Sequence, residues 1–467
     1  MKKKLFAVCG NPILHSKSPQ LFSDAYQNAG IDAVYTRLAV DSAEQAIELA
    51  KEISLNGMNI TAPFKSDIIN FIDNIDIHSK EIGAVNTVVL DDNQYSGFNT
   101  DYLAITNSMT LLSPHINGLK CLVIGAGNAA KAAAYALKML HCNVTITNRT
   151  NERAEILANK FNVNFVSIEE AQSKINDFDA VISTLPYCID IDNSFKIKEG
   201  KIFIEACYVI PTDLLNERTR KFLYFSGLDW LKEQAIPAFE LMTGIKADSS
   251  FMKEFVDYDS NMSFLRMQES PKLLQKEIPT FAGMTDFKST TNHSICERND
   301  NIVLIGFMGA GKTWTGRELS SMLDYRFIDT DELIEQSEGC PVLDIFQNKG
   351  EAYFRELETN IINSLLCTTG AVISCGGGAV LNPKNIINLK KLGIVIWLFA
   401  NFRECLNRIP PDTRPILNSS EDISKIFKTR IPIYCSASDL IVPSGLDENP
   451  VNKIYNEYIL WRKLSAQ

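Results

Sequence analysis

The sequence lacks the features of several large classes of protein. None of its apolar runs approaches the ~18 residues that a membrane span requires, so we expect no membrane association. Its 11 cysteines include no CxxC pair and its 5 histidines form no HExxH motif, so neither a disulfide framework nor a zinc site is indicated. Aspartate and glutamate (56) outnumber lysine and arginine (46), and the net charge of −10 argues against a nucleic-acid-binding protein.

A secretory signal is not indicated either. The lysines after Met1 precede an apolar segment, but this segment ends at Gly10 and is too short for the apolar core of a signal peptide. We therefore expect a cytoplasmic protein with reduced thiols.

What the sequence does contain is typical of an α/β protein. Apolar residues make up 45% of the 467 residues and charged residues 22%, as in globular proteins. At roughly 100–200 residues per domain, this length suggests two to four domains. Near the N-terminus, expected strands at 4–10, 34–38 and 57–60 alternate with expected helices at 18–30 and 42–53. This alternation favours a mostly parallel sheet covered by helices.

The chain divides into three expected domains and a connector. Residues 258–299 hold Pro271, Pro279, Gly283 and the polar run 289–294, and we interpret them as a linker or an insertion. The expected division is a first domain at 1–105 with a returning helix at 236–257, a second at 106–235 and a third at 300–467.

A glycine-rich turn at 125–130 (GAGNAA) follows an apolar strand and precedes an Ala-rich helix. In a Rossmann fold, such a turn places the pyrophosphate of a dinucleotide at the helix N-terminus. After the next expected strand, Asn148-Arg149-Thr150 stands where an NAD site has an acidic residue. An arginine there favours a 2′-phosphate, so the pattern predicts NADP rather than NAD.

Four short polar motifs carry further candidate chemistry. They lie at 10–19, 59–65, 83–87 and 99–101, and each places hydroxyl or amide side chains around a tight turn. Such groups suit a carboxylate or a polyhydroxylated ring. Lys65 is the only obvious proton carrier among them, and a nearby aspartate would hold it in place.

Over residues 1–255, these motifs together resemble the shikimate dehydrogenase family, which reduces 3-dehydroshikimate to shikimate with NADPH. The resemblance implies that Ser16 and Ser18 bind the substrate carboxylate. It implies that Lys65 is the catalytic acid and base, with Asp101 as its partner. The implied ring contacts are Thr61, Asn86, Asp101, Tyr208 and Gln234. The implied cofactor contacts are Gly125, Ala126, Gly127, Asn128, Ala129, Asn148, Arg149, Thr150, Arg153 and Gly227. Asn128 departs from the family, which usually has glycine there.

A second phosphate turn opens the last domain. Residues 306–313 (GFMGAGKT) form a complete GxxxxGK[ST] motif between an expected strand and an expected helix. The backbone N–H groups of such a loop cradle phosphates, Lys312 reaches the β- and γ-phosphates, and the Thr313 hydroxyl ligates Mg²⁺. Asp329, Asp331 and separated arginines downstream suit an anionic phosphoryl acceptor.

Residues 300–465 resemble the shikimate kinase family. The implied shikimate contacts are Asp331, Arg355, Gly377 and Arg430, with both arginines on the carboxylate. The implied nucleotide contacts are Gly309, Ala310, Gly311, Lys312, Thr313, Trp314 and Arg414. Thr313 and Asp329 would hold Mg²⁺, the latter through water, and Asp331 is the best candidate for the general base. Trp314 departs from the family, where a small hydroxyl residue is usual.

The leading hypothesis is a bifunctional enzyme that makes shikimate with NADPH and then phosphorylates its 3-hydroxyl with MgATP. Two alternatives stay open. The same folds could act on quinate and another small polyol acid. Alternatively, the chain could be a ligand-binding or scaffolding protein with one decayed active site, which Asn128, Trp314 and the unusual linker would suggest. The expected partners are the small molecules 3-dehydroshikimate and shikimate, with no nucleic acid and no membrane. The sequence does not distinguish a monomer from a homodimer.

Overall fold

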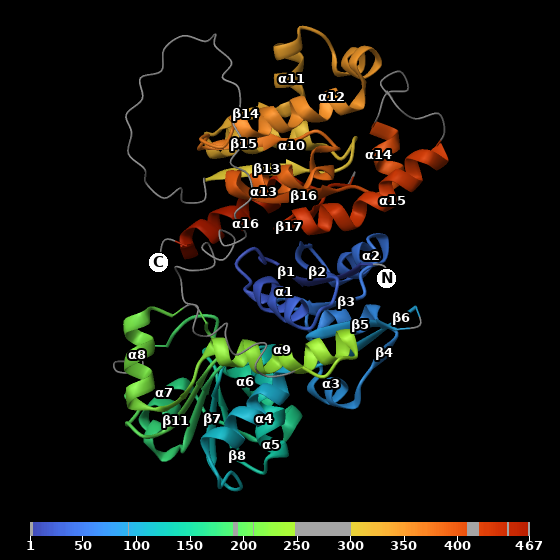
Figure 1. Ribbon diagram of the computed structural model, residues 1–467. Coiled ribbons are helices and arrows are strands. Elements are labelled where there is room, and N and C mark those ends of the chain that lie inside the picture. The colour runs from blue at the N-terminus through green and yellow to red at the C-terminus, as the bar shows by residue number, and fades with distance from the viewer. Residues whose placement is uncertain are drawn as a thin grey trace.

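The computed structural model describes residues 3–91, 93–189, 195–208, 210–247, 300–408, 420–445 and 448–465. These residues form an α/β fold of two largely parallel sheets with helices on their faces, as predicted (Figure 1). The expected linker at 258–299 and the expected lid residue Arg414 lie outside the described residues.

The first part of the chain contributes six strands to one sheet. Its elements are β1 (Lys4–Gly10), α1 (Ser18–Asn28), β2 (Ala33–Ala39), α2 (Ala43–Glu52), β3 (Gly57–Ile60), η1 (Asp67–Phe71), β4 (Asn74–Ile75), α3 (Ile77–Ile82), β5 (Thr87–Asp91) and β6 (Gln94–Phe98). β1 is buried from Leu5 to Gly10 because helices cover both faces of the sheet. Only β5 runs antiparallel to its neighbours β3 and β6 among the described strand pairs.

The second part builds a separate six-stranded sheet in the order β12-β11-β10-β7-β8-β9. Its elements are α4 (Asp101–Leu112), β7 (Lys120–Ile124), α5 (Asn128–Met139), β8 (Asn143–Thr147), α6 (Asn151–Phe161), β9 (Asn164–Phe165), α7 (Ile168–Ser173), η2 (Ile175–Asp177), β10 (Ala180–Ser183), β11 (Ile202–Glu205), α8 (Thr212–Lys221), β12 (Leu223–Phe225) and α9 (Gly227–Thr243). Its strand pairs are parallel, as in a Rossmann domain.

The last part begins after the linker. Its elements are β13 (Asn301–Ile305), α10 (Lys312–Leu323), β14 (Arg326–Asp329), α11 (Thr330–Glu338), α12 (Val342–Ser364), β15 (Ala371–Ser374), η4 (Ala379–Leu381), α13 (Pro383–Leu392), β16 (Gly393–Phe399), α14 (Phe402–Arg408), α15 (Ser420–Ala437), β17 (Leu440–Pro443) and α16 (Pro450–Ser465). The P-loop lies between β13 and α10, where the motif predicts it.

The sheets of the first and last parts are continuous. The strand order β14-β15-β13-β16-β17-β2-β1-β3-β5-β6-β4 joins them through β17 and β2, which pair in parallel with Ile441 opposite Leu38. Both side chains are fully buried. The two parts are therefore packed against each other.

The returning helix differs from its expected range of 236–257. It is α9, which begins at Gly227 and ends before Gly244, whose φ of 71° is typical of a helix C-cap. Its start is set by a capping box, in which Ser226 and Asp229 satisfy each other's backbone N–H groups. Residues 248–257 of the expected helix lie outside the described residues.

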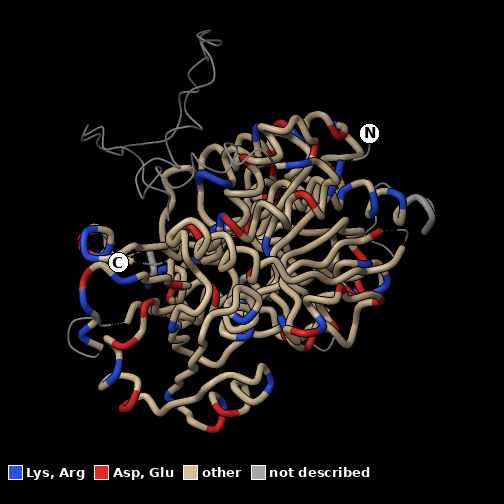
Figure 2. Tube along the Cα trace, turned by 90° about the horizontal axis from the view of Figure 1, so that it is seen from below, with Lys and Arg blue, Asp and Glu red and all other residues tan. Residues whose placement is uncertain are grey.

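The surface carries both signs of charge. Basic and acidic residues of the described chain are interspersed over the outer elements (Figure 2). Among the described residues, no helix combines the length and the apolar character needed to cross a membrane.

Candidate active sites

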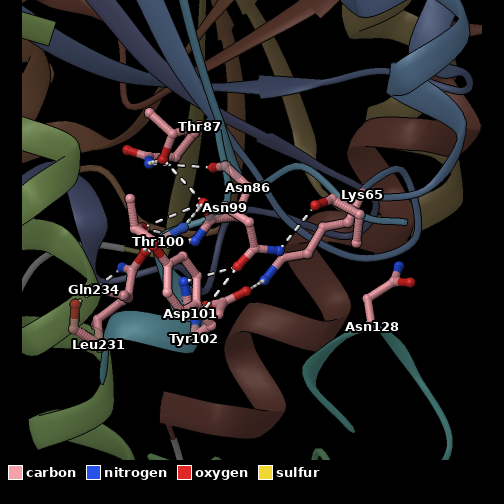
Figure 3. A network of polar contacts seen from close by, with 12 residues as sticks. Lys65, Asn86, Thr87, Asn99, Thr100, Asp101, Tyr102, Asn128, Leu231 and Gln234 are labelled. Carbon is pink, nitrogen blue, oxygen red and sulfur yellow. Dashed lines mark hydrogen bonds and ion pairs between the residues drawn. The ribbon is translucent and has the colours of Figure 1, made fainter. Parts of the chain in front are cut away.

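Lys65 and Asp101 form an ion pair in the dehydrogenase-like region. Their Nζ and Oδ2 atoms are 2.6 Å apart, and the side chains are 15% and 7% exposed (Figure 3). Lys65 lies in the turn after β3, and Asp101 is the first residue of α4. Asn99 Oδ1 accepts the backbone N–H of Asp101 at 3.0 Å, which orients the start of the helix. The two residues that the sequence names as catalytic partners thus meet.

A hydrogen-bond network lies beside this pair. The Asn86 amide donates to Thr100 Oγ1 at 2.9 Å and to Gln234 Oε1 at 3.1 Å (Figure 3). Gln234 comes from α9, so the helix returning from the second part completes a polar surface begun by the first. Thr61 lies close in sequence to Lys65, and its backbone N–H donates to Cys9 O at 2.9 Å.

The two serines form a second polar group after β1. The Ser16 hydroxyl donates to Ser18 Oγ at 3.3 Å. Arg37 on β2 donates to the Ser16 carbonyl from Nε at 3.1 Å and from Nη2 at 2.6 Å. Burial raises the pKa of Tyr208 to about 12, and the positive charge of Arg37 opposes this shift. Tyr208 therefore stays a neutral hydroxyl at physiological pH.

The glycine-rich turn fits a pyrophosphate. Gly125 has a φ of 120°, and a Cβ there would meet the Thr184 hydroxyl, so only glycine fits without strain. Gly127 caps α5 without a side-chain hydrogen bond, which leaves the first backbone N–H groups of the helix available to an anion. A Cβ on Gly227 would likewise meet Cys207 O, so the start of α9 lies directly against the backbone after β11.

Asn128 has a role that the sequence does not reveal. It is the first residue of α5, and its φ is not positive. Asparagine is therefore not needed here to adopt a left-handed backbone conformation. Its Oδ1 accepts from Ser66 Oγ at 2.7 Å, and Lys131 Nζ donates to the same hydroxyl at 2.8 Å. The departure from glycine thus links the cofactor turn to the residue after Lys65.

The residues expected at the cofactor ribose lie at the start of α6. Asn148 donates to Thr150 O at 3.1 Å, which shapes the turn. Arg149 and Arg153 are exposed, and neither forms a hydrogen bond or ion pair within the described part of the chain. Both guanidinium groups are available to a 2′-phosphate.

The P-loop has the geometry that its motif predicts. Gly311, with a φ of 87°, caps α10 without a side-chain hydrogen bond. Lys312 Nζ donates to the loop carbonyls of Gly306 at 3.0 Å and Phe307 at 3.1 Å. The Thr313 hydroxyl donates to Asp329 Oδ2 at 3.1 Å. A hydroxyl beside a carboxylate fits Mg²⁺, which takes few protein ligands and completes its shell with water and phosphate oxygens.

A cluster of acidic and basic side chains lies next to the P-loop. A Cβ on Gly376 would lie 2.6 Å from Asp331 Oδ1, and one on Gly378 would meet the Arg355 guanidinium. Arg430 Nη1 donates to Gly377 O at 3.3 Å. The bare backbone of residues 376–378 therefore brings one carboxylate and two arginines together.

Comparisons with known proteins identify families that match both halves of the chain. Family models match residues 8–88 (shikimate dehydrogenase substrate binding domain), 109–189 (shikimate / quinate 5-dehydrogenase) and 308–461 (shikimate kinase). The chain is 34% identical over 263 residues to a shikimate dehydrogenase (NADP(+)) of Staphylococcus aureus, covering 54% of this chain and 97% of the relative. The chain belongs to the shikimate dehydrogenase family. It also carries a C-terminal shikimate kinase domain.

Solved shikimate dehydrogenases share the fold of the N-terminal half. The structure of the Aquifex aeolicus enzyme has a TM-score of 0.50 and 32% identity, over 54% of this chain and 97% of that one. A shikimate dehydrogenase solved in complex with NADP+ has a TM-score of 0.50 and 28% identity, over 55% and 95%.

The kinase domain contains a buried carboxylate, Glu358, to which the sequence assigns no role. Glu358 pairs with Arg355 at 3.0 Å, and burial raises its pKa to about 7. Burial and the neighbouring Asp329 raise the pKa of Asp331 to about 6. The spacing of three residues between Arg355 and Glu358 on one helix was a usable signal for this ion pair. Tyr434 is another residue to which the sequence assigns no role. Its hydroxyl donates to Gly377 O at 2.5 Å.

Proposed function

We propose that this chain is a bifunctional enzyme that reduces 3-dehydroshikimate to shikimate with NADPH and phosphorylates shikimate with MgATP. The observation that carries the proposal is the coexistence of two complete polar sites in one chain. One site contains the Lys65–Asp101 pair. The other contains Asp331, Arg355 and Arg430 beside a P-loop. We place the enzyme in the cytoplasm, where its cysteines stay reduced.

NADPH supplies a hydride and MgATP a phosphoryl group when they are bound. In the dehydrogenase site, Lys65 holds the proton that the substrate carbonyl oxygen gains, and the carboxylate of Asp101 keeps the ammonium group in place. Ser16 and Ser18 bind the substrate carboxylate, and Thr61, Asn86, Tyr208 and Gln234 bind the ring hydroxyls. The exposed Arg149 and Arg153 select the 2′-phosphate of NADPH, in line with the relatives named for NADP(+).

In the kinase site, Asp331 accepts the proton of the shikimate 3-hydroxyl. Arg355 and Arg430 hold the shikimate carboxylate over the bare backbone at Gly377. Lys312 neutralises phosphate charge, while Thr313 and Asp329 hold Mg²⁺. Arg414, outside the described residues, contributes a further charge to the phosphates.

The proposal is tested by giving the full chain 3-dehydroshikimate, NADPH, ATP and Mg²⁺. NADPH loss and formation of shikimate 3-phosphate are followed together. Lys65→Ala is expected to abolish the first signal while the protein still phosphorylates supplied shikimate, and Lys312→Ala is expected to do the reverse. If the intact protein forms neither product, the proposal is wrong. Replacing shikimate with quinate in both assays decides between the two substrate classes.

A further inference from the structure

A carboxylate of the kinase domain is buried against the dehydrogenase substrate site. Glu457, in the middle of α16, is 2% exposed. It accepts the backbone N–H of Ile13 at 2.8 and 2.9 Å and that of Leu14 at 2.7 Å. Ile13 and Leu14 belong to the segment 11–18 after β1, called here the serine loop because it carries Ser16 and Ser18.

This contact sets the backbone from which the serines project. The N–H of Ser16 donates to Ile13 O at 2.9 Å, so the turn that carries Ser16 starts at a residue that Glu457 holds. The N–H groups of Ile13 and Leu14 are bonded by Glu457 in a buried region. Without that acceptor, two buried donors would lose their partner, which is costly unless the loop moves to find water.

A second link to the same loop crosses the junction of the two sheets. Arg37, which donates to the Ser16 carbonyl, also donates from Nη1 to Asp439 O of the kinase domain at 3.2 Å. Nearby, Lys453 of α16 pairs with Asp41 at 2.7 Å. Two groups therefore hold the serine loop. Glu457 belongs to the kinase domain, and Arg37 is itself bonded to the kinase domain.

We propose that the kinase domain completes the substrate site of the dehydrogenase, with Glu457 as a positioning residue that sets Ser16 and Ser18 for the substrate carboxylate. The inference rests on the proposed function, in which these two serines bind that carboxylate. Glu457 touches neither substrate nor cofactor, so its effect falls on the affinity for shikimate and not on the cofactor or on phosphoryl transfer.

The test uses the full chain and three variants. Glu457→Ala is expected to raise KM for shikimate in the NADP⁺-dependent oxidation about tenfold, equivalent to ~1.4 kcal/mol. KM for NADP⁺ and the kinase kinetics stay as in the unchanged protein. Glu457→Gln keeps one acceptor oxygen and is expected to give an intermediate rise. Asn456→Ala, an exposed neighbour on the same helix, is the matched control and changes nothing.

A double-substitution cycle separates positioning from a general loss of stability. In a background that combines Ser16→Ala and Ser18→Ala, Glu457→Ala is expected to add little to KM, because the two hydroxyls it positions are already gone. Additive effects, an unchanged KM in Glu457→Ala, or an equal loss of kinase activity would each overturn the inference. If the unchanged protein does not oxidise shikimate at all, the proposed function fails first and the inference falls with it.

Discussion

The buried carboxyl groups of Asp331 and Glu358 lower the stability of the kinase domain at neutral pH. Burial raises the pKa of Asp331 to about 6 and that of Glu358 to about 7. In an unfolded chain, such carboxyl groups ionise near pH ~4. Between these values the folded state binds more protons than the unfolded state, so these two groups lower the free energy of unfolding as pH rises. Above pH ~7 their full cost is present.

Asp331→Asn is therefore expected to stabilise the kinase domain while it removes phosphoryl transfer. Losing a general base lowers kcat by about 10²–10⁴-fold. At pH 8 the neutral amide avoids burying a charge, which is worth about 3 kcal/mol for a pKa raised from 3.8 to about 6. The gain should shrink as pH falls from 6 towards 4, because Asp331 is then protonated and uncharged in the folded state. Urea unfolding followed by tryptophan fluorescence at several pH values measures it, and a gain that does not vary with pH would contradict this explanation.

Trp314 offers a direct reporter of nucleotide binding. Its side chain is 58% exposed and follows Thr313 in the first turn of α10. We expect MgATP to change the fluorescence of this tryptophan in a saturable way, because phosphates and metal bind within one residue of it. Trp314→Ser should lose most of the signal and keep kinase turnover within about tenfold, as expected for an altered contact and not a lost catalytic group. A full signal in Trp314→Ser would assign it to another tryptophan.

The sequence could predict those site residues that stand in local motifs. Lys65 lies in the polar turn after β3, Asp101 begins α4, and Asp331 follows a strand beside a P-loop, so pattern and resemblance were enough to name them. Glu457, Arg37 and Asn128 act through contacts with residues far away in the chain. Nothing in their own neighbourhoods signals this, because the distance between elements is fixed only by packing.

At the scale of the element, α9 connects the two lobes of the dehydrogenase. The expected range of 236–257 begins too late, because the helix starts at Gly227 and continues through Pro237. The signal for the true start was the Ser226…Asp229 capping box. By contrast, the sequence predicted where α5 and α10 begin, because a glycine turn precedes each of them.

Gly227→Ala should displace this helix. A Cβ at this position would meet Cys207 O, a backbone atom that has little freedom to move. Since Gln234 lies two turns further along α9 and bonds Asn86, we expect KM for shikimate to rise about tenfold, corresponding to ~1.4 kcal/mol. The kinase reaction should be unaffected. Gly200→Asn is the control, since Gly200 has a positive φ but open space around it, and asparagine tolerates that conformation. Unchanged dehydrogenase kinetics in Gly227→Ala would contradict this prediction and show that the start of α9 accommodates the added Cβ.

At the scale of the whole molecule, the continuous sheet is the feature that the sequence could least predict. The strands β2 and β17 both have the apolar patterns of buried strands, but each also completes the expected sheet of its own domain. Their pairing rests on Ile441 opposite Leu38 and on side chains such as Arg37 and Lys453. An unpaired strand edge must be covered or paired, and which partner does so depends on the assembled surfaces.

This junction predicts that ligands of one enzyme stabilise the other. A ligand that binds only the folded kinase at 100 times its Kd stabilises that domain by about 2.7 kcal/mol. Because α15 and β17 pack against β2 and Glu457 holds the serine loop, part of this stabilisation should reach the dehydrogenase. A non-hydrolysable ATP analogue with Mg²⁺ is therefore expected to lengthen the half-life of dehydrogenase activity during heating. Lys312→Ala, which loses phosphate binding, is the control and should show no protection. If the analogue protects kinase structure but leaves dehydrogenase inactivation unchanged, the two enzymes are energetically independent despite their shared sheet.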